Sequence, residues 1–202
     1  CHAYNAVVFC DHTSGYFGKY RIQSSLIGAQ ALNDTFKGID LLIHIGEVSG
    51  DYYSIVRPAK VWRVSEDGEI RDTFHVLTHI FEMPSANFFR YYAELVDSSD
   101  NDIFLQKSKT EYTQIETSIP ELPFSNVWIA QHTAPRIPVN SVVHLGILNS
   151  LRAWNFFPFP DGVESNCNVG GFGIDGILST VVGAAIARPE KIFFAVVGDL
   201  AF

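Results

Sequence analysis

Short apolar runs alternate with longer segments of helical spacing along both halves of the chain. Several of these runs are almost wholly apolar and end in glycine or turn residues, while 60–64 alternates apolar and basic residues; both patterns are typical of strands. The ranges expected to form strands are 4–10, 40–46, 60–64, 75–81, 141–148, 163–169 and 191–197. The ranges expected to form helices are 22–36, 85–95, 124–134 and 177–187. Strands that alternate with helices predict parallel sheets covered by helices on their faces.

The helix expected at 85–95 has a start signal and an apolar stripe. Ser85 follows a proline and is expected to cap the helix, because serine is favoured at that position. The stripe, expected to face inward, consists of Phe88, Phe89, Tyr92 and Leu95.

A polar stretch divides the chain. Residues 97–102 read DSSDND, and residues 103–123 show no sustained apolar period and end in prolines. We therefore expect a linker at 98–123 between two separate units, 1–97 and 124–202. The expected fold class is α/β, with two Rossmann-like parallel-sheet units and helices on both faces. The second unit is expected to be truncated, since the chain starts with Cys1 and stops at Phe202 after an apolar run, as if cut from a longer protein.

Composition excludes several classes of protein. Of the 202 residues, 47% are hydrophobic and 18% charged, which is a globular composition. The formal net charge of -8 argues against nucleic acid or an acidic membrane surface as a partner. No apolar run reaches the roughly 18 residues needed to span a bilayer. The three cysteines, Cys1, Cys10 and Cys167, form neither a zinc pattern nor a disulfide framework, which favours a reducing compartment, the cytoplasm.

A glycine-rich turn carries the clearest chemical signal. Residues 171–176 read GFGIDG, the pattern G-x-G-x-x-G, between an expected strand and an expected helix. Glycines let backbone N–H groups approach an anion, and the helix N-terminus adds partial positive charge. Asp199 follows at the end of the next expected strand. The pattern favours a diphosphate ligand, but it does not identify that ligand; an NAD- or FAD-binding oxidoreductase or a purely structural turn also satisfies it.

Three segments in the second unit resemble one family at matching spacing: GIDG at 173–176, Ser179-Thr180, and GDL at 198–200. The stretch from 165 to 202 is similar to the thiamine-diphosphate-binding domain of the 2-succinyl-5-enolpyruvyl-6-hydroxy-3-cyclohexene-1-carboxylate synthases of menaquinone biosynthesis. The segments at 40–49 (DLLIHIGEVS) and 61–72 (VWRVSEDGEIRD) resemble the central domain of that family, in the same order. The resemblance implies a central domain at 1–97 and the N-terminal part of the diphosphate-binding domain at 124–202.

The resemblance implies thiamine diphosphate and Mg²⁺ as cofactors. Asp199 would be a magnesium ligand, and Ile174 would hold the cofactor in its bent form. Asp175 is expected to cap the helix or to lie near the cofactor. The residues implied to surround the cofactor are Gly173, Ile174, Asp175, Gly176, Gly198, Asp199 and Leu200.

Ser150 and Arg152 follow the strand expected at 141–148, where a parallel sheet collects its ligands. The resemblance implies that they bind substrate carboxylates. The spacing between them is shorter than in the family, and Val169 stands where the family has an arginine. Because of these departures, an acetolactate-synthase-like enzyme that acts on another 2-oxoacid remains an alternative. None of the seven histidines is assigned to catalysis.

The reaction that the resemblance implies is a carboligation, catalysed by a transferase. It would decarboxylate 2-oxoglutarate and add the resulting carbanion to an acceptor, isochorismate. The full-length enzyme is expected to be a homodimer or homotetramer. The family's catalytic glutamate is expected to lie upstream of Cys1, so no catalytic residue is expected here and the chain alone is expected to be inactive. A non-catalytic domain whose glycines only shape an interface remains a further alternative.

Overall fold

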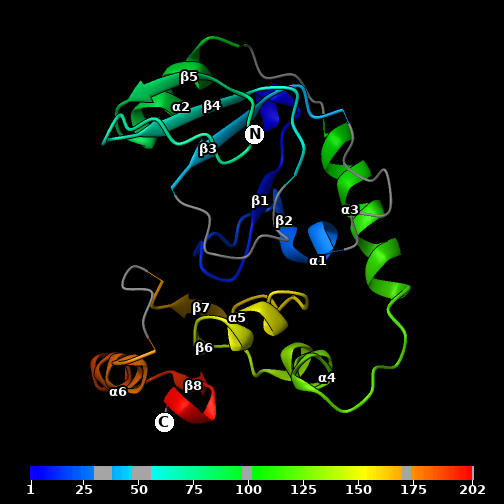
Figure 1. Cartoon of the computed structure of the whole chain (residues 1–202), viewed down its shortest axis with the longest axis vertical. Coiled ribbons are helices and arrows are strands. Elements are labelled where there is room, and N and C mark those ends of the chain that lie inside the picture. Colours follow the sequence, from blue (N-terminus) through cyan, green and yellow to red (C-terminus); the bar gives the residue numbers. More distant parts are fainter. Residues whose placement is uncertain (30–37, 47–55, 97–101, 170–173, 202) are drawn as a thin grey trace.

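The structure is a computed structural model that describes residues 1–29, 38–46, 56–96, 102–169 and 174–201. Part of the helix expected at 22–36 and most of the glycine-rich turn lie outside these ranges. The described elements form parallel sheets with helices packed against them, which confirms the α/β class (Figure 1). Within the described ranges, no helix combines the length and the apolar character that crossing a membrane requires.

Residues 1–96 contain two sheets rather than the single unit expected from sequence. β1 (Val8–Cys10) pairs in parallel with β2 (Arg21–Gln23), and α1 (Ser24–Ala29) follows at once. The second sheet has the order β3-β4-β5, with all its strands parallel. Its strands are β3 (Leu42–Ile45), β4 (Val61–Ser65) and β5 (Leu77–Glu82). The β2 strand was missed because only Ile22 is apolar in its three residues.

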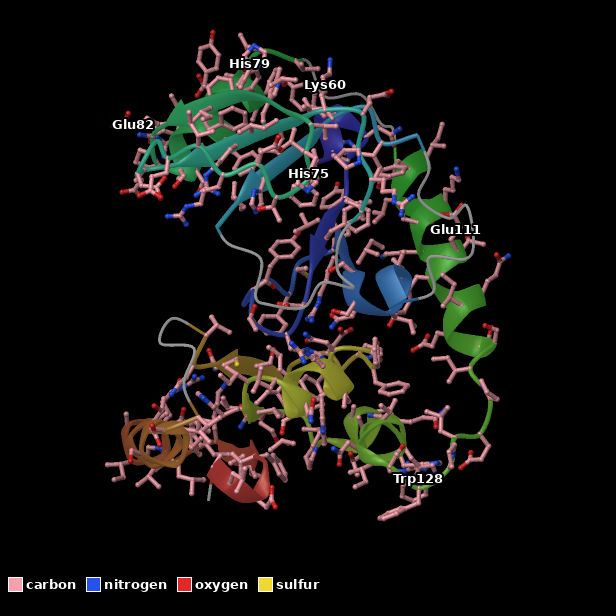
Figure 2. All side chains as sticks on the ribbon, viewed as in Figure 1. Lys60, His75, His79, Glu82, Glu111 and Trp128 are labelled. Carbon is pink, nitrogen blue, oxygen red and sulfur yellow. The ribbon has the colours of Figure 1, made fainter. Side chains whose placement is uncertain are left out.

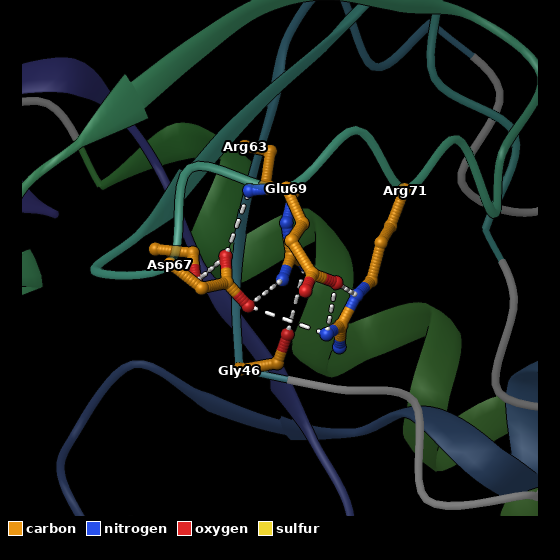
Figure 3. A network of polar contacts seen from close by, with 6 residues as sticks. Gly46, Arg63, Asp67, Glu69 and Arg71 are labelled. Atoms are coloured by element: carbon orange, nitrogen blue, oxygen red, sulfur yellow. Dashed lines mark hydrogen bonds and ion pairs between the residues drawn. The ribbon is translucent and has the colours of Figure 1, made fainter.

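The sheet β3-β4-β5 has a buried cation at the centre of its middle strand. Arg63 on β4 is fully buried, and its guanidinium donates to the Gly46 carbonyl at 3.3 Å. Its Nη2 lies 3.6 Å from Oδ2 of Asp67, which also lies 3.3 Å from Nη2 of Arg71 (Figure 3). The guanidinium of Arg63 is therefore buried with carbonyl and carboxylate partners, as a buried charge requires.

The helix α2 (Ser85–Glu94) is shorter and more exposed than its pattern predicts. Pro84 occupies the N-cap position and no side chain caps the helix, so the expected Ser85 cap is wrong. Phe88 is buried, but Phe89 and Leu95 are 45% and 59% exposed, so the inward stripe is narrower than expected.

A helix, α3 (Ile103–Thr117), occupies most of the segment that was expected to be a linker. It packs on α1 and β2, and Leu105 and Ile115 belong to a buried core cluster with Ile22 and Leu26. The buried stripe of α3 includes Ser108, which is fully buried, and Tyr112, which packs against the same cluster. Because a polar residue interrupts this stripe, the helical period is hidden from a reading based on apolar residues alone.

The second unit is a three-stranded parallel sheet with β6 at its centre, in the order β7-β6-β8. Its strands are β6 (Ser141–Leu145), β7 (Glu164–Cys167) and β8 (Ile192–Val196). Its helices are α4 (Asn126–Thr133), α5 (Asn149–Trp154) and α6 (Ile177–Ala187). The bounds of α6 agree with the sequence expectation, whereas α5 was missed because β6 ends three residues earlier than expected.

The core of the second unit lies between one face of this sheet and the helices α4 and α5. Val143 and Leu145 of β6 pack there with Ala130 of α4 and with Leu151 and Trp154 of α5. The connections from β6 to β7 and from β7 to β8 run in opposite directions across the sheet. Right-handed crossovers of opposite direction place α5 and α6 on opposite faces.

Candidate functional site

The residues singled out in the second unit collect at one edge of its sheet. The strands are parallel, and Leu145 at the end of β6 is level with Cys167 of β7 and Val196 of β8. Beyond this edge come α5 after β6, α6 after β7, and the 3-10 helix η4 (Asp199–Ala201) after β8. Because α5 and α6 leave the sheet on opposite faces, the order β7-β6-β8 places the expected crevice between β6 and β8, the usual ligand site of such sheets.

The N-terminus of α6 is arranged as an anion site. Gly176 is its N-cap residue, with φ of 76° in the left-handed region, and no side chain among the described residues caps the helix. The expectation that Asp175 caps α6 is therefore wrong. A Cβ atom built on Gly176 would meet nothing within 4 Å. The first-turn N–H groups of α6 are thus able to donate hydrogen bonds to a bound anion, and their geometry is suited to a phosphate group.

A chain of polar side chains ties this turn to the sheet. Oγ1 of Thr180 donates to the Gly176 carbonyl at 2.9 Å, and Nδ2 of Asn168 donates to Oγ1 of Thr180 at 3.1 Å. Burial lowers the pKa of His144 on β6, and the nearby Asn168 side chain opposes this shift. The position of Gly176 is therefore tied through Thr180 to the residue that follows β7.

Asp199 lies at the start of η4, just beyond β8, and is exposed. A Cβ atom on the preceding Gly198 would meet nothing within 4 Å, and Leu200 is 86% exposed. In the described part of the chain, no group of three or more His, Cys, Asp and Glu side chains is placed to hold a metal ion. An exposed carboxylate at the same sheet edge as the N-terminus of α6 fits a magnesium–diphosphate group, since Mg²⁺ is commonly held by one or two carboxylates and by phosphate oxygens.

Ser150 and Arg152 lie on α5, on the other side of the expected crevice. Both are half-buried, and Arg152 forms no ion pair with a carboxylate among the described residues. Leu148, the N-cap residue of α5, has φ of 67°, which an ordinary residue rarely adopts. Ile174 is half-buried next to the turn, and Gly173 lies outside the described residues.

The three cysteines are free thiols, as their spacing indicated. Cys167 ends β7 at the edge where the candidate residues collect. Burial, and to a lesser degree the charge of Asp11, raises the pKa of Cys167 to about 12. The thiol therefore stays protonated and is not an activated nucleophile.

The histidines form no shared site among themselves, in keeping with the sequence interpretation. His75 and His79 lie apart, on the loop before β5 and on β5 itself (Figure 2). On α4, which carries Trp128 (Figure 2), the Trp128 and His132 rings are tilted against each other with centroids 4.3 Å apart, and both donate to Oε1 of Glu121. Sequence reasoning missed His12, which is fully buried between the two units, because its partners lie more than 140 positions away.

Comparison with known proteins identifies one family. No family model matches the chain. The 2-succinyl-5-enolpyruvyl-6-hydroxy-3-cyclohexene-1-carboxylate synthase of Bacteroides fragilis is 36% identical over 146 residues, which cover 72% of this chain and 26% of that protein. The synthases of the same name from Phocaeicola vulgatus and Bacteroides thetaiotaomicron are 32% and 31% identical, each over 72% of this chain and 25% of their own length.

Three synthases that share one name therefore each match nearly three quarters of the chain. The chain spans about a quarter of the length of these relatives. Their name is that of the family that residues 40–49, 61–72 and 165–202 resemble. The chain belongs to the family of 2-succinyl-5-enolpyruvyl-6-hydroxy-3-cyclohexene-1-carboxylate synthases.

Proposed function

We propose that this chain is part of a thiamine-diphosphate-dependent carboligase of menaquinone biosynthesis. The enzyme would decarboxylate 2-oxoglutarate and transfer the resulting group to isochorismate. Membership of the synthase family supports this reaction. The structural observation that carries the proposal is the meeting of an uncapped helix N-terminus at Gly176 and an exposed carboxylate at Asp199 on one sheet edge.

In this proposal the second unit holds the diphosphate end of the cofactor. The first-turn N–H groups of α6 bind phosphate oxygens, and Asp199 binds Mg²⁺. Gly173 and Gly198 give room for close approach, while Ile174, Asp175 and Leu200 border the cofactor. Bound thiamine diphosphate supplies the electron-accepting chemistry that decarboxylation of a 2-oxoacid requires.

Ser150 and Arg152 are proposed to bind a substrate carboxylate. An arginine forms two parallel hydrogen bonds to a carboxylate, and a serine hydroxyl adds a third donor. Arg152 suits this role because it is half-buried without a carboxylate partner among the described residues. The 2-oxoacid and its acceptor are the proposed small-molecule partners.

We further propose that these residues act within a homodimer or homotetramer in the cytoplasm. The 202-residue chain alone is expected to be inactive and to bind the cofactor weakly. The reason is that, in the part of the chain that the structure describes, no group of three or more His, Cys, Asp and Glu side chains is placed to hold a metal ion, and Mg²⁺ gives up its water ligands reluctantly.

The test is Asp199→Asn in the full-length enzyme, with Asp161→Asn as the control. Asp161 is also an exposed aspartate, but it lies in the turn before β7, at the opposite end of the strand from the site. We expect Asp199→Asn to raise the Mg²⁺ requirement and abolish decarboxylation of 2-oxoglutarate, while Asp161→Asn has little effect. Wild-type rates with an unchanged metal requirement in Asp199→Asn contradict the role. Turnover of pyruvate in preference to 2-oxoglutarate contradicts the proposed substrate.

A further inference from the structure

His12 joins the two units of the chain. It lies in the loop after β1, and Nε2 of its ring is 2.9 Å from the Phe157 carbonyl oxygen and 3.2 Å from that of Trp154. The ring stacks on Phe159 with 4.1 Å between centroids. A fully buried side chain of the first unit therefore fits between carbonyl and aromatic groups of the second.

The backbone of His12 is held by the same unit. Its N–H donates to Oδ1 of Asn155 at 3.0 Å, and its carbonyl accepts from Oγ of Ser165 at 2.7 Å. Nε2 of Gln23, at the end of β2, donates to the Asn155 carbonyl at 3.0 Å. Asn155 is itself fully buried. The contact is thus a continuous set of buried hydrogen bonds and not a single pair.

The neighbours of the His12 ring settle its tautomer. Nη2 of Arg21 lies 3.4 Å from Nδ1, and because a guanidinium only donates, Nδ1 is the acceptor. The proton of the neutral ring is then on Nε2, where it points to the carbonyls of Trp154 and Phe157. Burial, as the largest cause, lowers the pKa of His12 to about 4, so the ring is neutral at physiological pH.

His12 and Gln23 bind carbonyls at and just beyond the end of α5: Trp154 is its last residue, Asn155 is its C-cap residue and Phe157 follows in the next turn. A helix leaves its last carbonyls without partners inside the helix, and here side chains of the first unit bind the chain where α5 ends. With only six residues, α5 contains few internal hydrogen bonds, so its placement depends on its ends. At its other end, Leu151 N–H donates to the Gly146 carbonyl at 2.9 Å.

We propose that His12, assisted by Gln23, is a positioning residue of the first unit that fixes α5 and thereby Ser150 and Arg152. This inference rests on the proposed function, which gives Ser150 and Arg152 the substrate carboxylate. The first unit then contributes to 2-oxoacid binding without touching the substrate. Loss of the His12 hydrogen bond changes substrate affinity more than the chemical step, because α5 stays folded but less well placed.

The kinetic test uses His12→Phe in the full-length enzyme, which retains a ring against Phe159 but removes the donor. His12→Gln replaces the donor near the position of Nε2, and His132→Phe is a control at an exposed face of α4. We expect His12→Phe to raise KM for 2-oxoglutarate by roughly tenfold, the equivalent of one hydrogen bond, with kcat and the KM of thiamine diphosphate nearly unchanged. His12→Gln is expected to recover part of the affinity. Equal changes in all three parameters, or no change in KM for 2-oxoglutarate, overturn the inference.

A second measurement does not depend on activity. Hydrogen exchange of the backbone amides at 149–157 is expected to quicken in His12→Phe and in Gln23→Leu, while exchange in α4 stays the same. Gln23→Leu is included because it removes one cap of α5 and leaves the buried His12 in place. Unchanged exchange at 149–157, or the same acceleration in every element, overturns the inference. Absence of turnover in the wild-type enzyme contradicts the proposed function alone, since the exchange experiment still tests the placement of α5.

Discussion

Arg188 and Glu164 form a two-pronged ion pair that joins the end of α6 to the first residue of β7. Nη1 and Nη2 of Arg188 lie 2.7 and 2.8 Å from the two carboxylate oxygens of Glu164. Lys191 also donates to this carboxylate. These donors hold the pKa of Glu164 at about 2. The helix whose N-terminus forms the candidate anion site is therefore anchored to the sheet at its opposite end.

Removing the charge of Glu164 should weaken this anchor. We expect Glu164→Gln to lower the free energy of unfolding at pH 7 by about 1 kcal/mol or less, because the carboxylate is partly exposed and screened by solvent. The folded-state pKa is lowered, so the stabilisation is complete above the ordinary glutamate pKa and is lost as pH falls toward 2. Urea denaturation of both proteins between pH 2 and pH 7 measures the difference.

Glu190→Gln is the matched control for this experiment. Oε1 of Glu190 lies 3.9 Å from Nε of Arg188, and the side chain is 64% exposed, so its removal should change stability much less. A stability difference between Glu164→Gln and the wild type that persists at pH 2 would show that the ion pair is not its source.

Because of His12, we expect the protein to lose folding stability in a second pH range, above the range in which Glu164 acts. Its pKa falls from 6.5 to about 4 on folding, chiefly because of burial, so the folded state binds its proton less readily than the unfolded state does. The stabilisation is therefore complete above pH 6.5 and is lost as pH falls from 6.5 toward 4. A shift of this size corresponds to about 3 kcal/mol at most. In urea denaturation at pH 7, 6 and 5, the wild type should lose stability more steeply than His12→Phe; parallel curves contradict this assignment.

Local patterns predicted the parallel sheets and the helix α6, but not the contacts between the units. The apolar runs at 40–46 and 191–197 become β3 and β8, because a buried parallel strand needs only a short apolar run bounded by turn residues. The helix α3 was missed because Ser108 lies in its buried stripe. The role of His12 depends on carbonyls far along the chain, and no short-range pattern records such a contact.

Leu148 carries backbone strain that a glycine would relieve. Its φ of 67° and ψ of -124° are unfavourable for a residue with a Cβ atom, and its side chain is 42% exposed. We expect Leu148→Gly to raise the free energy of unfolding, or leave it unchanged, with a gain of up to about 1 kcal/mol. Leu95→Gly is the control, since Leu95 is 59% exposed at an ordinary φ of -81° and should lose stability. Thermal unfolding compares the two variants, and an equal loss in both contradicts the claim of strain at Leu148.

Alanine substitutions at Gly176 and Gly162 allow the effect of backbone strain on stability to be told apart from the effect of lost ligand contact. Both have positive φ, 76° and 86°, and a Cβ atom on either would meet nothing within 4 Å. Alanine at either position should lower the free energy of unfolding by about 1 kcal/mol, because a Cβ atom disfavours the left-handed region. Gly162 lies in the turn before β7, at the end of the strand opposite the candidate site, whereas Gly176 caps α6.

Thiamine diphosphate binding should therefore distinguish two variants of similar stability. In the full-length enzyme with Mg²⁺, we expect Gly176→Ala to weaken binding by tenfold or more in a calorimetric titration, since the new methyl group occupies space reserved for the diphosphate. Gly162→Ala should bind the cofactor like the wild type. Pyrophosphate tested against both variants should show the same contrast, because the contact involves the phosphate groups alone. Equal cofactor affinity in the two alanine variants would place the diphosphate away from the N-terminus of α6.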